Sequence, residues 1–147
     1  MSKYKQSGFT LVELVVVIVI LGILAATAIP RFAGYTTESR IAALNGLAGA
    51  LRSSVAIVQG RYIALGAGTS PVTMLDGTMV AVGVAATTGG VPLSTAGGID
   101  LAVTTGNTFV YTAGAATGTW NFPTAVVNCL VTYTAATGAS VVTSGGC

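Results

Sequence analysis

Histidine is absent from the 147 residues of this chain, and only 7% of the residues are charged. Without histidine the chain has no Ser–His or Cys–His pair, and its four acidic residues are scattered along the sequence. The usual groups of acid–base and nucleophilic catalysis are therefore missing. The six basic residues form no patch or stripe of the kind that binds nucleic acid. The sequence predicts neither an enzyme, nor a protein with a cofactor, nor a nucleic-acid-binding protein.

Lysine is nearly absent as well, since it occurs only as Lys3 and Lys5, ahead of a long apolar run. Removal of residues 1–8 would change six basic and four acidic residues into four of each, which leaves no net side-chain charge. With 52% apolar residues, the chain has too few charges for the surface of a typical soluble domain. This composition favours a protein that packs closely against other molecules over a dilute enzyme.

Cysteine occurs only at Cys129 and Cys147. In an exported protein two cysteines indicate one disulfide, whereas cytosolic chains rarely form structural disulfides. The bridge would close a loop, residues 129–147, and stabilise the fold by about 3 kcal/mol in the chain-entropy model. Two buried free thiols are the alternative. A metal site is disfavoured because there is neither a histidine nor a third thiolate.

The apolar run covers residues 9–29, which is about 31 Å of helix at 1.5 Å per residue and long enough to span a bilayer. The two lysines ahead of it favour a cytoplasmic N-terminus. An ordinary secretory signal cleaved after Ala26-Thr27-Ala28 would fit this pattern, and so would a permanent membrane anchor. Neither explains Glu13, because an acid at the centre of a membrane helix costs about 2.5 to 3.5 kcal/mol.

A third interpretation accounts for this glutamate. The stretch "GFTLVELVVVIVILGILAATAIPRF" closely resembles the N-terminus of type IV pilins. The resemblance implies that residues 1–8 are a leader that a membrane-embedded prepilin peptidase cuts after Gly8. It implies further that Phe9 becomes an N-methylated terminus, and that Glu13 meets the terminal amine of a neighbouring subunit. A carboxylate in a low-dielectric filament core needs such a partner, and residues 9–29 contain no basic side chain to supply one.

The resemblance also implies where the protein acts and with what. The prepilin would wait in the inner membrane, and the assembly machinery would then lift it into a helical filament of identical subunits on the cell surface. The filament would serve attachment or motility, and the sequence does not identify a surface or host receptor. The runner-up is a pseudopilin of a type II secretion or DNA-uptake system, which shares the leader and the glutamate. A monomeric adhesin anchored by the apolar run leaves the glutamate unexplained.

We expect one helix over residues 9–62, about 80 Å long. Its part 9–30 would form the membrane segment and filament core, and its part 31–62 would be amphipathic. Gly22 and Pro30 make the stretch between them the easiest part to unwind, since interior glycine costs about 1 kcal/mol and proline about 3. In related filaments this segment loses helicity on assembly. One face of the amphipathic part is apolar at spacings of three and four, and it carries Leu44, Leu47, Leu51, Val55, Val58 and Tyr62. We expect the arginines of this part at exposed or subunit-facing positions.

Residues 63–147 are predicted to form a globular head in which an antiparallel sheet lies on the apolar helix face, giving an α+β fold. β-branched runs separated by Gly- and Thr-rich turns predict the strands, which we place at residues 78–85, 99–105, 107–113, 125–135 and 139–144. The "TTGNT" between two of them predicts a hairpin turn. We expect Trp120 in the core of the sheet. The stretches "SRIAALNGLAGALRSSVAIVQGRY" and "NCLVTYTA" resemble the mannose-sensitive haemagglutinin branch of the type IVa pilins.

Overall fold

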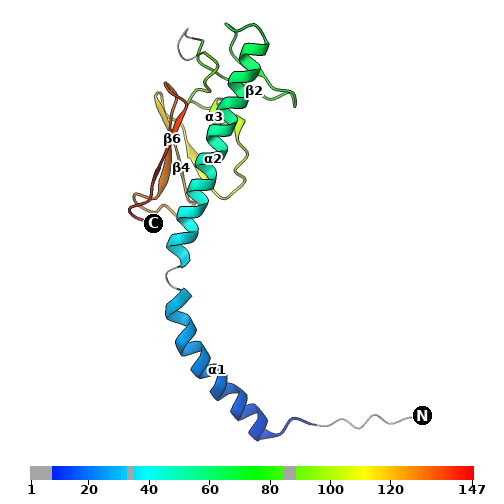
Figure 1. Ribbon diagram of the computed structural model, residues 1–147, viewed down its shortest axis with the longest axis vertical. Coiled ribbons are helices and arrows are strands. Elements are labelled where there is room, and N and C mark those ends of the chain that lie inside the picture. The colour runs from blue at the N-terminus through cyan, green and yellow to red at the C-terminus, as the bar shows by residue number, and fades with distance from the viewer. Residues whose placement is uncertain (1–7, 33–34, 85–88) are drawn as a thin grey trace, which may run out of the picture. The chain divides into compact units, whose positions relative to one another are not determined.

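The chain folds into two helices followed by a head of short strands, as seen in a computed structural model that describes residues 8–32, 35–84 and 89–147 (Figure 1). Helix α1 is Leu11–Phe32 and helix α2 is Tyr35–Ala64. The expected single helix over residues 9–62 is thus described as two, and residues 33–34 between them lie outside the described residues. The chain divides into two compact units, Met1–Thr37 and Glu38–Cys147, so most of α2 belongs with the head.

The buried face of α2 is the one that the sequence predicts. All six apolar residues at the spacing of threes and fours are at most 7% exposed, and they are Leu44, Leu47, Leu51, Val55, Val58 and Tyr62. Ala48 and Ser54 complete this face. Residues three and four apart lie on the same side of a helix, so the periodicity alone determined which residues enter the core.

The head contains a four-stranded antiparallel sheet in the order β3-β4-β5-β6. Its strands are β3 Val110–Thr112, β4 Thr117–Asn121, β5 Leu130–Thr134 and β6 Ala139–Thr143. Two shorter strands, β1 Val72–Thr73 and β2 Met79–Val80, form a separate pair. Figure 1 shows α2 running alongside the larger sheet. The architecture is therefore α+β, as predicted.

Aromatic side chains of the sheet form the centre of the core against α2. Trp120 on β4 and Tyr133 on β5 are at most 1% exposed, and they belong to one cluster with Leu44 and Leu51 of α2. Their rings meet edge to face with centroids 6.5 Å apart, and the ring of Tyr111 lies 4.4 Å from that of Trp120. Alternate side chains of a strand point to opposite faces of its sheet. Trp120 thus lies in the sheet core, as expected.

Residues 99–105, predicted as a strand, instead begin with a short helix, α3 Ile99–Ala102. The carboxylate of Asp100 accepts a hydrogen bond from the Gly97 N–H at 3.2 Å, and the Leu101 N–H donates to the Gly98 carbonyl. Short polar side chains that bind nearby backbone groups offer the chain an alternative to a strand ladder. The strand prediction was wrong because it relied on the β-branched composition of this segment and gave no weight to these local hydrogen bonds.

The hairpin predicted at "TTGNT" is also wrong, because β3 pairs with β4, a strand that the sequence analysis missed. Strand β4 contains Gly118 at a buried position, where composition argued against a strand. The ring of Tyr111 on β3 occupies the space that a Cβ on Gly118 would need. Glycine is therefore required at this position by a neighbour in space and not by the local sequence.

Tyr133→Phe tests the polar part of this core. The buried Tyr133 hydroxyl donates to the Pro92 carbonyl oxygen at 2.7 Å. Its removal leaves that carbonyl without its partner, so we expect a loss of about 1 to 3 kcal/mol in the free energy of unfolding. Chemical denaturation of the full chain in detergent, followed by near-ultraviolet circular dichroism, measures it.

The same variant has a predicted pH signature. Burial raises the pKa of Tyr133, and burial together with the charge of Asp100 raises the pKa of Tyr111 to about 12. A raised pKa means that stability is full below the unfolded value of about 10 and falls as the pH rises toward 12. Tyr133→Phe should show a shallower fall than wild type, and the exposed Tyr35→Phe is the control. Equal slopes for Tyr133→Phe and wild type would contradict this account.

Candidate functional site

Helix α1 presents an apolar surface on all sides. It has 22 residues, about 33 Å of helix. The window Leu11–Ala28 has a mean hydropathy of 2.8, and none of it is buried within the described residues. Helix α2 also meets the length and composition of a membrane span, but 39% of its window is buried. Because a core helix passes the same test, α1 is the stronger candidate for a segment that another molecule or a membrane covers.

Glu13, the acidic residue at the start of α1, is bound by Thr10 of its own chain. Its Oε2 accepts hydrogen bonds from the Thr10 N–H at 2.9 Å and from the Thr10 hydroxyl at 2.7 Å. The Glu13 N–H donates in return to Thr10 Oγ1 at 3.3 Å. This reciprocal pair is a capping box, which satisfies backbone donors at the first turn of a helix.

The role of Thr10 was not predicted from the sequence, because a carboxylate in an apolar run indicates a positive partner and residues 9–29 contain no basic side chain. The T-x-x-E spacing immediately before an apolar run is the signal that would have identified a capping box. Both donors of Thr10 are neutral, so Thr10 provides hydrogen bonds to the carboxylate but no opposite charge.

Gly8 and Phe9 precede α1 in a stretch without regular structure. Phe9 is 79% exposed. A Cβ added to Gly8 would meet nothing within 4 Å, and no positive φ is recorded there. The fold of the described chain therefore does not require glycine at this position. A requirement for glycine at residue 8 would have to come from another molecule.

Helix α1 runs through both Gly22 and Pro30. A Cβ on Gly22 would also meet nothing within 4 Å. Proline lacks the N–H that a helix interior would use, so this stretch holds fewer backbone hydrogen bonds than its neighbours. The predicted loss of helicity between these residues concerns the filament and stays a prediction.

The disulfide Cys129–Cys147 is present, with an S–S distance of 2.08 Å and Cα atoms 4.9 Å apart. Cys129 is fully buried in the core beneath α2. Two further contacts hold the same tail: Arg40 Nη1 donates to the Cys147 carbonyl oxygen at 3.2 Å, and the Gly146 N–H donates to Asn128 O at 3.0 Å. The C-terminal residues are thus attached both to the sheet and to α2.

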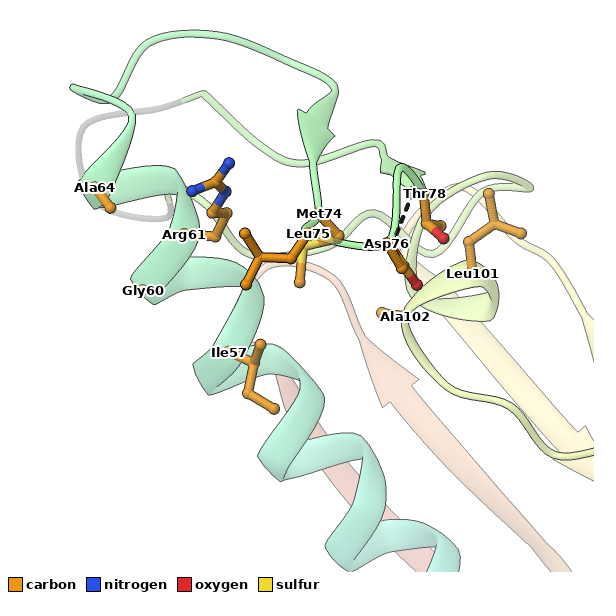
Figure 2. Close-up of a pocket in the computed structure, with 10 residues that line it drawn as sticks. All are labelled: Ile57, Gly60, Arg61, Ala64, Met74, Leu75, Asp76, Thr78, Leu101 and Ala102. Atoms are coloured by element: carbon orange, nitrogen blue, oxygen red, sulfur yellow. Dashed lines mark hydrogen bonds between the residues drawn. The ribbon is translucent and has the colours of Figure 1, made fainter.

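The head also carries an apolar groove of about 540 Å³ between α2, the β1–β2 pair and α3. Figure 2 shows Ile57 of α2 on one side of the groove and Leu101 of α3 on the other, with Leu75 between them. Leu75 is 91% exposed, so its side chain is open to solvent at the groove. Most of the lining side chains are hydrocarbon, among them Ile57, Leu75 and Leu101.

The two charged residues of this groove are both bound within the head. Arg61 Nε donates to the Thr73 carbonyl oxygen at 3.1 Å. Asp76 accepts from the Thr78 N–H at 2.9 Å (Figure 2), and this bond holds the pKa of the carboxyl below its ordinary value. Within the described residues, no three His, Cys, Asp or Glu side chains come together as metal ligands. The groove therefore offers mainly apolar contact, and its Asp76 carboxylate is already held by Thr78.

Known proteins resemble this chain over part of its length. A family profile described as the prokaryotic N-terminal methylation motif matches residues 3–29. The type IV narrow pilus major component PilA5 of Thermus thermophilus is 49% identical over 53 residues, which cover 36% of this chain and 46% of that protein. The type IV major fimbrial protein FimA of Dichelobacter nodosus is 42% identical over 53 residues, 36% of this chain and 34% of that protein.

A fimbrial protein of Pseudomonas aeruginosa is 41% identical over 64 residues, which cover 42% of each chain. The chain thus matches less than half of the length of each of these curated relatives. No solved structure matches it.

Replacement of both cysteines tests the tail. The bridge closes a loop with a sequence separation of 18 residues, so C129A/C147A should lower the free energy of unfolding by about 3 kcal/mol. Denaturant titration of the full chain in detergent measures this loss. Reductant should bring wild type down to the variant and leave the variant unchanged. A variant as stable as oxidised wild type would show that the other contacts suffice to hold the tail.

Proposed function

Because this chain has the N-terminal segment of a type IV pilin, we propose that it is a structural subunit of a type IV pilus. The observation that carries the proposal is α1, a helix that is apolar all round and unburied in the chain itself, with a single carboxylate in its first turn. A helix that is apolar on every side needs a surrounding of membrane or protein. The relatives are pilus and fimbrial components by name, which favours a pilus over a secretion pseudopilin.

The chain reaches the filament in two covalent steps. A prepilin peptidase removes residues 1–8 after Gly8, and the new terminus at Phe9 is N-methylated. The matched methylation motif, which includes these residues, supports both steps. Cleavage also removes Lys3 and Lys5, the basic residues that hold the N-terminus on the cytoplasmic side.

In the filament, burial of α1 against its neighbours supplies the main driving force. The same burial takes the Glu13 carboxylate out of water, which costs several kcal/mol unless an opposite charge compensates. Thr10 gives that carboxylate two hydrogen bonds but no charge. The methylated amine of a neighbouring Phe9 provides the charge. This pair thus determines the register of neighbouring subunits in the filament. The stretch between Gly22 and Pro30 unwinds during this step.

The subunit is a precursor in the inner membrane and then part of an extracellular filament. Its partners are copies of itself, the peptidase that methylates it and the pilus assembly machinery. The head faces outward and serves attachment or motility. The protein is acted on by enzymes and is not one itself.

The mass and terminus of the filament protein test the processing steps. We expect protein sheared from cells to begin at Phe9 and to carry one extra methyl group, as shown by intact mass and N-terminal fragment sequencing. Gly8→Ala should leave the uncleaved precursor, although the added methyl has free space in the chain. Gly22→Ala, also with free space, is the control and should be cleaved normally. A terminus at Ile29, or normal pili from Gly8→Ala, would overturn the assignment.

Two substitutions of Glu13 separate its local role from its role between subunits. Glu13→Ala removes both the cap and the charge, and we expect processed but unassembled subunits. Glu13→Gln keeps an oxygen that accepts the Thr10 hydrogen bonds. The cap, which stabilises a helix by about 0.5 to 2 kcal/mol, should therefore remain. It lacks the charge, and pili should again be absent in electron micrographs and in sheared fractions. Normal pili from Glu13→Gln would mean that the cap is sufficient and that no amine pairs with residue 13.

A further inference from the structure

Strand β6 lies at one edge of the larger sheet, because the strand order is β3-β4-β5-β6 (Figure 1). An edge strand exposes a row of backbone N–H and C=O groups that a second chain can pair with. The segment "ASVVTS", residues 139–144, holds β6 and contains no charged residue and no proline. Short uncharged segments with high β-propensity are the kind that add to one another. This edge therefore needs protection.

The phase of the ladder identifies which groups are unpaired. The Ala135 N–H, at the end of β5, donates to Ala116 O at 3.0 Å on the β4 side. The backbone groups of Thr132, an odd number of residues away, therefore point toward β6, where Thr132 pairs with Val141. In an antiparallel pair, hydrogen-bonded and non-hydrogen-bonded positions alternate. The backbone groups of Val141 thus point toward β5, while those of Ser140 and Val142 point away from the sheet.

A charged side chain on α2 reaches this outward row. Arg52 of α2 donates from Nη2 to the carbonyl oxygen of Ser140 at 3.0 Å. Among the described residues, no hydrogen bond is recorded to the backbone groups of Val142. A guanidinium at a strand edge places a permanent charge and a bound side chain where a second strand would have to pair, and charged side chains are a common protection of sheet edges.

We propose that the edge of β6 is a self-pairing surface for a second copy of β6 and that Arg52 keeps it closed in the subunit. Two copies pair antiparallel around a two-fold axis with Val141 opposite Val141. This register places Ser140 of each copy opposite Val142 of the other, so every outward backbone group finds a partner. It requires displacement of both Arg52 side chains. The proposal does not depend on the role of the chain in a pilus.

The unmodified protein provides the first test. Amide exchange of the full chain in detergent should be slow at Val141, whose N–H points toward β5, and fast at Val142, whose N–H has no recorded partner. Equal protection of the two amides in a monomeric sample would show that the Val142 N–H already has a partner within the subunit and would overturn the proposal.

Arg52→Gln tests whether Arg52 prevents a second copy of β6 from pairing. We expect the sedimenting mass of the protein in the micelle to double at concentrations at which wild type is monomeric, and exchange at Ser140 and Val142 to slow. Arg61→Gln is the matched control, because Arg61 lies on the same helix and also donates to a backbone carbonyl, that of Thr73. A monomeric Arg52→Gln with the near-ultraviolet dichroism of wild type, or equal dimerisation of Arg61→Gln, would contradict the assignment.

Val141 tests the register, because its side chain is 59% exposed and would face its own copy. In the Arg52→Gln background, Val141→Lys should restore the monomer, since like charges directly opposite are destabilising. Val141→Glu should do the same. A mixture of the lysine and glutamate variants should dimerise again through opposite charges. Dimers that persist with Val141→Lys alone, or a mixture that stays monomeric, would rule out this pairing.

Discussion

The contact between the apolar face of α2 and the sheet is the interaction on which the head depends. Leu44, Leu47 and Leu51 meet Trp120 and Tyr133 in one buried cluster. The strands are short, five residues at most, and a sheet of this size is stable only when one of its faces is covered. The disulfide and the Tyr133 hydroxyl add to this contact, because Cys129 and Tyr133 both lie inside the same cluster.

The cations of α2 also support this contact. Arg40, Arg52 and Arg61 were expected at exposed or subunit-facing positions; Arg52 is exposed and the other two are half-buried. Each of the three donates to a backbone carbonyl of the head. These carbonyls lie in the C-terminal tail, on the β6 edge and in β1. The arginines thus donate to backbone carbonyl oxygens at strand edges and in the tail, where a regular ladder does not supply a donor. A salt bridge at an exposed site would contribute little by comparison.

Helix α1 shows the opposite situation, since no residue of its Leu11–Ala28 window is buried among the described residues. The capping box between Thr10 and Glu13 satisfies the helix start within one molecule. The carboxylate is therefore held in a defined position by contacts within the chain.

The sequence by itself determined the features that follow from local rules. The spacing of Leu44 to Tyr62 defined the buried face of α2, the apolar run defined α1, and the two cysteines defined the bridge. The Thr10–Glu13 spacing contained a capping box that could have been recognised. Only the tertiary structure decided that Gly118 belongs to a strand beneath Tyr111 and that Arg52 meets the edge of β6. The physical reason is that periodicity and capping act between residues a few positions apart, whereas strand order and side-chain reach depend on contacts between residues far apart in the chain.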